Sequence, residues 1–180
     1  MEPLSAAAHY TLRFINQTNK SIFLTGKAGT GKTTLLKEII ATTHKNTVVV
    51  APTGIAALNA NGVTIHSMFQ LPFAAFIPDN KQLPHFSETV KFENRDSLGR
   101  HFKMNNVKRS VIRNMELLII DEVSMLRADV LDAIDFMMRK VRRNERPFGG
   151  TQVLFIGDLL QLPPVVKNEE WEMLKKYYRG

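Results

Sequence analysis

Residues 26–33 read Gly-Lys-Ala-Gly-Thr-Gly-Lys-Thr, which satisfies the pattern G-x-x-x-x-G-K-[ST] at every position. An apolar run at 21–25 leads into this stretch, and a helix-forming segment at 34–40 follows it. A strand, a glycine-rich loop and a helix in this order form the context in which such a loop binds phosphate. We therefore predict a phosphate-binding loop here rather than a simple turn.

Each residue type in this loop suits a nucleoside triphosphate. Gly26, Gly29 and Gly31 lack a Cβ atom, so the chain can wrap closely around phosphate oxygens. The N–H groups that open the following helix have no partner within that helix and can point at the ligand. Lys32 supplies a cation for the β and γ phosphates, and the Thr33 hydroxyl suits a Mg²⁺ ligand. The predicted phosphate contacts are Gly26, Lys27, Ala28, Gly29, Thr30, Gly31, Lys32, Thr33 and Thr34.

The order of apolar runs and helical patterns predicts a three-layer α/β fold with a mainly parallel central sheet. Nearly continuous apolar runs, typical of strands covered on both faces, lie at 21–25, 47–51, 117–120 and 152–156. Apolar spacing predicts helices over 4–17 and 128–142. Basic residues crowd the last turns of the second helix, where cations favour the helix dipole. Residues 74–104 show no clear period, so we expect an irregular insertion there.

Polar residues directly follow two of these runs. Asp121 and Glu122 come after the run at 117–120, and Gln161 lies in a proline-stiffened loop after the run at 152–156. Ligands of open α/β sheets bind at the carboxyl ends of the strands, so Asp121 is placed to hold Mg²⁺ and Glu122 to polarise an attacking water. A fixed amide at Gln161 can distinguish ATP from ADP, although a glutamine in a turn is also an ordinary surface residue.

Small and hydroxyl-bearing residues open helices within 51–58 and 64–69. Such helix starts offer donors to a nucleic-acid phosphate, and His66 or Phe69 can stack on a base. Phe69 fits an ordinary core position equally well.

Composition bounds the class of protein. The 180 residues correspond to one ordinary domain, and 44% of them are hydrophobic, enough for a sizeable core. The chain has no cysteine, which excludes disulfides and thiolate catalysis and fits a reducing cytoplasm. Neither a signal peptide nor an apolar run of about 20 residues is present, so we expect a cytoplasmic protein without membrane contact. The net charge of +7 suits a polyanion such as nucleic acid, and equally suits simple solubility.

Four segments together resemble the first motor domain of Pif-type DNA helicases, related to the RecD-like branch of superfamily one. The matching segments are 26–33, 51–58 with 62–69, 118–125 (LIIDEVSM) and 157–165 (GDLLQLPPV). Their order and spacing both agree with the family. The resemblance implies a RecA-like P-loop NTPase fold and ATP hydrolysis with Mg²⁺. It also implies movement along single-stranded DNA from the five-prime toward the three-prime end.

The resemblance also assigns roles by position. It makes Lys32 a phosphate ligand, Thr33 and Asp121 ligands of Mg²⁺, Glu122 the catalytic base and Gln161 the sensor of the γ-phosphate. The DNA contacts that it implies are Pro52, Thr53, Gly54, Thr64 and His66. At the position of a family glutamine that recognises adenine this chain has His9, and Gln17 lies closer to the loop than expected.

The second RecA-like domain of the family, with its arginine finger, does not follow in this chain, and we expect it in the same parent protein. Phosphoryl transfer needs positive charge beyond the γ-phosphate, and translocation needs two domains that close around ATP. We therefore expect the 180-residue chain alone to bind nucleotide weakly, to hydrolyse it slowly at best and not to unwind DNA.

Three other classes of protein carry a similar loop. A GTPase would need Asn-Lys-x-Asp, whereas residues 80–83 read Asn-Lys-Gln-Leu, and a small-molecule kinase would not need the 157–165 segment. A non-catalytic nucleotide- or nucleic-acid-binding module remains the main alternative to a motor domain.

Overall fold

The computed structural model describes residues 5–27, 29–80, 83, 90–101 and 103–179. The strands of its main sheet are β1 (Ile22–Leu24), β2 (Thr47–Ala51), β3 (Val63–Thr64), β6 (Leu117–Ile120) and β7 (Gln152–Ile156). All five are parallel and lie in the order β1-β7-β6-β2-β3. The register of β6 and β7 places Leu117 opposite Gln152 and Ile120 opposite Phe155.

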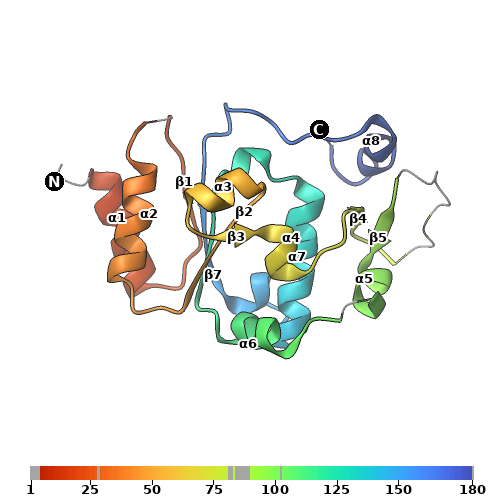
Figure 1. Ribbon diagram of the computed structural model, residues 1–180, viewed down its shortest axis with the longest axis horizontal. Helices are drawn as coiled ribbons and strands as arrows, with labels where there is room; N and C mark the ends of the chain where they lie inside the picture. The colour runs from red at the N-terminus through yellow and green to blue at the C-terminus, as the bar shows by residue number, and fades with distance from the viewer. Residues whose placement is uncertain (1–4, 28, 81–82, 84–89, 102, 180) are drawn as a thin grey trace.

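Helices cover both faces of this sheet and complete three layers (Figure 1). They are α1 (Ala6–Gln17), α2 (Lys32–Thr42), α3 (Gly54–Asn59), α4 (Ile65–Phe69), α6 (Asn106–Asn114) and α7 (Ala128–Arg142). Leu117 and Ile119 of β6 belong to a buried cluster with residues of α1 and α2. Leu118 and Ile120 belong to the opposite cluster, with residues of α4, α6 and α7. This alternation confirms the predicted three-layer α/β fold.

Two helices lie where the apolar spacing predicts them. α7 has the predicted bounds and α1 ends at the predicted residue, while residues 1–4 lie outside the described part. The basic end of α7 has structural partners: Arg139 pairs with Asp135 at 2.9 Å, and Arg142 donates to the carbonyl of Met115 at 2.8 Å. Within the described residues, no helix is both long and apolar enough to cross a membrane.

Strand β1 differs from the prediction of a strand covered on both faces. It lies at an edge of the sheet, where β7 is its neighbour, and the side chain of Phe23 is 47% exposed. The strand has only three residues, and all of them are apolar. A run this short has the same pattern in an edge strand as in a central one, so the sequence could not distinguish the two positions.

The sequence predicted an irregular insertion at 74–104, and this prediction is wrong for part of the segment. It contains two short parallel strands, β4 (Ala75–Ile77) and β5 (Phe92–Asn94), followed by α5 (Arg95–His101). Strands of three residues are too short to show a period in the sequence. Residues 81–82, 84–89 and 102 of this segment lie outside the described residues.

The C-terminal segment packs against this insertion. Leu174 of α8 (Asn168–Leu174) joins a buried cluster with Ala75 and Ile77 of β4. Beyond α8, the hydroxyl of Tyr177 donates to Asp79 at 2.6 Å. The insertion and the C-terminal segment thus form a small core of their own beside the main sheet (Figure 1).

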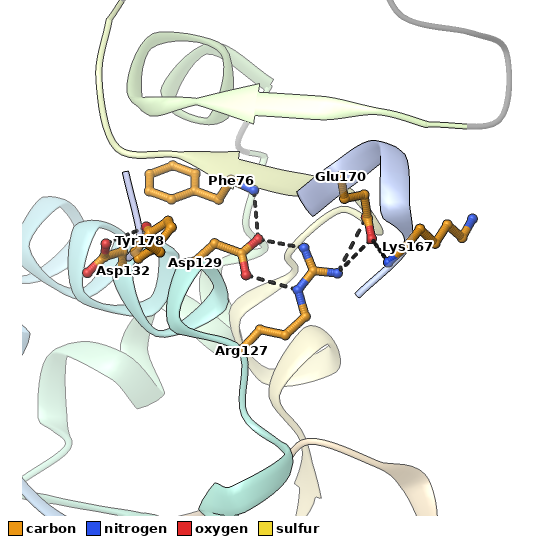
Figure 2. Close-up of polar contacts among 7 residues, drawn as sticks. All are labelled: Phe76, Arg127, Asp129, Asp132, Lys167, Glu170 and Tyr178. Carbon is orange, nitrogen blue, oxygen red and sulfur yellow. Dashed lines mark hydrogen bonds and ion pairs between the residues drawn. The ribbon is translucent and has the colours of Figure 1, made fainter. Parts of the chain in front are cut away.

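A buried ion pair joins this small core to α7 (Figure 2). Asp129, in the first turn of α7, is 1% exposed and accepts hydrogen bonds from the Arg127 guanidinium at 2.8 and 2.9 Å. The same carboxylate accepts the backbone N–H of Phe76 in β4 at 3.0 Å. Arg127 also pairs with Glu170 of α8 at 3.2 Å. One carboxylate and one guanidinium therefore connect three segments that are distant in sequence.

We expect Asp129→Ala to lower the free energy of unfolding by about 3 kcal/mol, because it leaves the N–H of Phe76 without its acceptor and Arg127 half-paired in a buried place. Denaturant titration followed by circular dichroism measures this loss. Glu172→Ala is the matched control, since its ion pair with Lys175 is exposed and should contribute less than about 1 kcal/mol. Equal losses in the two variants would contradict the role given to Asp129.

Candidate functional site

The parallel sheet brings the predicted site residues to one edge. The loop at 25–31 follows β1, the segment at 157–165 follows β7, and Asp121 follows β6. Farther along the same carboxyl edge, β2 and β3 are neighbours, and Ala51 of β2 is paired with Thr64 of β3. The segments that leave these two strands therefore also lie close together. The carboxyl edge of the sheet therefore gathers every segment to which the sequence assigns chemistry.

The phosphate-binding loop has the backbone geometry that its glycines permit. Gly29 and Gly31 have φ values of 78° and 86°, in the left-handed region that favours glycine. Gly31 is also the N-cap of α2, so the free N–H groups of that helix open onto the loop. A Cβ atom on Gly26 would lie 2.8 Å from the hydroxyl oxygen of Thr30. Ala28 lies outside the described residues.

The Lys32 ammonium group lies within the curve of this loop. It donates to the backbone carbonyls of Gly26 and Lys27, the latter at 2.8 Å. It is also close enough to Asp121 to lower the pKa of that carboxyl electrostatically. Thr33 follows in the first turn of α2 with an exposed side chain, as does Thr34. The structure thus brings the predicted phosphate cation and the predicted metal carboxylate together.

The backbone of Asp121 extends the hydrogen bonding between β6 and β2, and its side chain bonds to the next residue. Its N–H donates to the carbonyl of Val50 at 2.9 Å, and its carboxylate accepts the N–H of Glu122 at 2.9 Å. Burial raises the pKa of Asp121, and this effect exceeds the lowering by that hydrogen bond and by Lys32. A carboxylate that is costly to keep ionised has a strong preference for a cation beside it.

Glu122 occupies an unusual backbone conformation. Its φ and ψ are 53° and 46°, the left-handed region that costs a residue with a Cβ atom of order 1 kcal/mol or more. This turn takes the chain out of the sheet and starts a short 3-10 helix, η1 (Val123–Met125). Asn61, Gln70, Arg143 and Phe148 adopt the same region, so this conformation alone does not mark Glu122 as catalytic.

The segment after β7 lies directly against the segment after β6. The N–H of Gly157 donates to the carbonyl of Leu24 at 3.1 Å, and a Cβ atom on Gly157 would lie only 2.9 Å from the backbone nitrogen of Val123. Gln161, with an exposed side chain, lies in a turn closed by its N–H to the carbonyl of Asp158 at 3.0 Å. The structure therefore brings the loop of Gln161 beside that of Glu122.

Two of the predicted nucleic-acid contacts are helix N-caps. The hydroxyl of Thr53 accepts the N–H of Ala56 at 3.2 Å, and the hydroxyl of Thr64 accepts the N–H of Ser67 at 3.2 Å. A capping hydroxyl uses one lone pair and keeps its own O–H, so each can still donate to a phosphate. A Cβ atom on Gly54 would meet nothing within 4 Å, so there is open space beside the backbone at Gly54, two residues after Pro52.

The two candidate stacking residues have different environments. Phe69 is completely buried, so its interpretation as a base-stacking residue is wrong and the core alternative is confirmed. His66 is partly buried and stacks on Phe73 with ring centres 4.8 Å apart and an interplanar angle of 11°. Burial, followed by the charge of Arg127, lowers the pKa of His66. Phe73 lies in a turn of no recognisable motif, and the sequence analysis did not find it.

The comparison with sequence families decides the classification. The family described as PIF1-like helicase matches residues 7–176. The chain belongs to the PIF1-like helicase family.

Curated relatives agree with this assignment. The ATP-dependent DNA helicase PIF1 of Saccharomyces cerevisiae is 38% identical over 159 residues, which cover 84% of this chain and 16% of that protein. Its human counterpart is 38% identical over 152 residues, covering 84% and 21%. The chain thus spans about a fifth of the length of these curated PIF1 helicases.

Solved structures of the PIF1-like family share the fold. Bacteroides sp Pif1 in complex with ADP-AlF4 is 43% identical, has a TM-score of 0.84 and covers 100% of this chain and 38% of its own. Bacteroides Pif1 bound to ssDNA is 43% identical with a TM-score of 0.81, covering 100% and 38%. The fold of this chain is therefore the RecA-like fold of PIF1-like helicases, as the resemblance implied.

The residues at the carboxyl edge fit a magnesium–nucleotide complex. The glycine turn, the free N–H groups of α2 and the Lys32 ammonium offer donors to phosphate oxygens. The exposed Thr33 hydroxyl and the Asp121 carboxylate are oxygen ligands of the kind that Mg²⁺ prefers.

We expect Asp121→Asn to melt at a higher temperature than wild type at pH 7, by up to about 3 °C. Because burial raises the pKa of Asp121 above its unfolded value, the ionised form opposes folding at pH 7. The difference should narrow as the pH falls toward about 3.9, the unfolded pKa, and vanish well below it, where the carboxyl is protonated in both states.

Thermal scans between pH 7 and pH 3.5 measure this difference. Asp96→Asn is the control, since Asp96 is an exposed carboxylate in the first turn of α5 and its loss should not stabilise the protein. A lower melting temperature for Asp121→Asn at pH 7 would contradict the expectation.

Proposed function

We propose that this chain is the ATP-binding motor domain of an ATP-dependent DNA helicase that moves along single-stranded DNA from the five-prime toward the three-prime end. The observation that carries the proposal is the meeting of three loops at one sheet edge: the phosphate-binding loop, Asp121 with Glu122, and the loop of Gln161. The names of the curated PIF1 relatives and the ADP-AlF4 and ssDNA complexes of Bacteroides Pif1 support it.

The proposed chemistry follows from the side chains at this edge. The Lys32 ammonium and the N–H groups of α2 bind the phosphates of ATP, and Thr33 and Asp121 hold Mg²⁺. Mg²⁺, when bound, neutralises charge on the β and γ phosphates. Glu122 accepts a proton from the attacking water, and the Gln161 amide contacts the γ-phosphate.

The proposed DNA track begins next to this site. It consists of Pro52, Thr53, Gly54, Thr64 and His66, which the pairing of β2 with β3 places side by side. Hydroxyl and backbone donors at the starts of α3 and α4 suit the sugar–phosphate backbone of a single strand. Translocation requires a second RecA-like domain, which we place in the same parent protein, and we place that protein in the cytoplasm.

Hydrolysis tests the motor proposal against the alternative of a non-catalytic binding module. We expect Glu122→Gln to lower single-turnover ATP hydrolysis by about 100-fold or more and to leave nucleotide binding within about twofold of wild type. Because we expect slow turnover by the isolated chain, the assay uses excess protein over labelled ATP.

Glu116→Gln is the matched control, since this exposed residue lies just before β6, at the opposite end of that strand, and should change neither quantity. Turnover that persists unchanged in Glu122→Gln would favour the binding module.

DNA binding should depend steeply on salt. Contact with about four phosphates of a single strand predicts a slope of about −3 for log affinity against log salt, or about a 50-fold loss between 50 and 200 mM KCl. Fluorescence anisotropy of a labelled oligo(dT) measures it. Affinity that does not change with salt would exclude a phosphate track.

A further inference from the structure

Phe73 is an aromatic side chain that the nucleotide chemistry leaves unused. It is 88% exposed, compared with 60% for Tyr10 and 47% for Phe23. An exposed apolar residue by itself indicates nothing, because single ones are common on protein surfaces. Three further features of its surroundings distinguish Phe73 from such residues.

The backbone holds Phe73 outward on both sides. Leu71 before it is 8% exposed and Ala75 after it is completely buried, so the turn is anchored in the core at each end. The N–H of Ala74 donates to the carbonyl of Pro72 at 2.9 Å, and the proline ring fixes its own φ. The ring is therefore presented to solvent by an ordered turn, which lowers the entropic cost of binding on it.

One face of the Phe73 ring packs against the side chain of His66. It stacks on the imidazole of His66, nearly parallel and at a centroid distance of 4.8 Å. The lowered pKa of His66 keeps this imidazole neutral at pH 7, so the two rings form a flat, uncharged stack. With one face against His66 and the side chain 88% exposed, the other face of Phe73 is open to a planar ligand.

The neighbours of this stack suit nucleic acid. Thr64, two residues before His66, keeps a hydroxyl donor, and the Lys108 ammonium group donates to the carbonyl of Ser67 in α4. Ser67 and Gln70 are exposed and polar and Pro72 is exposed and apolar, so the segment around the ring is of mixed polarity. An exposed flat ring near groups that can donate hydrogen bonds to phosphate is typical of a base-stacking position.

We propose that Phe73 stacks on a nucleobase of the bound single strand, with His66 beneath it as a fixed support. This rests on the proposed function and adds to it a contact with a base, where the other track residues offer contacts to phosphates. Stacking of this kind tolerates any base, because every base has a π-face, and it contributes roughly a 5- to 150-fold gain in affinity per base.

The test compares a 12-nucleotide oligo(dT) with an abasic chain of the same length, each labelled and titrated with the 180-residue protein. We expect wild type to bind oligo(dT) about tenfold more tightly than the abasic chain. Phe73→Ala should lose about tenfold on oligo(dT) and nothing on the abasic chain. Phe73→Trp should retain the preference, and the emission that it adds to that of the native Trp171 should be quenched by oligo(dT) and not by the abasic chain. Tyr10→Ala, an exposed aromatic on α1, should match wild type on both.

The outcomes separate this inference from the proposed function. If wild type binds oligo(dT) with the expected salt dependence but Phe73→Ala binds it equally well, the stacking role is overturned and the DNA track stands. Equal losses by Phe73→Ala on both ligands also overturn the stacking role, since a base contact cannot affect an abasic chain. If wild type binds neither ligand, both the track and the stacking role are overturned.

Discussion

The parallel hydrogen bonding of β1, β7, β6, β2 and β3 is the constraint on which the site depends. Because the strands run in one direction, each of them delivers its following loop to the same edge, whatever the distance in sequence. The phosphate-binding loop and Gln161 are separated by about 130 residues, yet adjacent strands place their loops side by side. The same direction of β2 and β3 places the proposed DNA track beside the nucleotide site.

A second constraint ties the outer parts of the chain to this arrangement. Asp129 is buried, and its cost of desolvation is balanced by Arg127 and by the N–H of Phe76. Arg127 also acts electrostatically on His66, on the proposed DNA track. The insertion, the C-terminal helix and α7 therefore share one small polar network (Figure 2).

Sequence analysis succeeded where a pattern has one physical meaning. Strand β6 is apolar at four successive positions because both its faces are covered, and Gly29 and Gly31 of the predicted phosphate-binding loop are required by positive φ. It failed where local sequence permits two outcomes. The run of β1 reads the same at an edge as at the centre of a sheet, and three-residue strands in the insertion show no period. Phe69 and Phe73 are the same residue type, and only the fold decides that the first is in the core and the second in solvent.

The close approach of Gly157 to Val123 has a mechanical consequence. Because there is no room for even a methyl group between them, the backbone that precedes Gln161 and the backbone that carries Glu122 are in direct van der Waals contact. A displacement of either one pushes on the other through van der Waals repulsion, without any hydrogen bond to transmit it. Any residue larger than glycine at position 157 would therefore push the backbone that leads to Gln161 away from the backbone that carries Glu122.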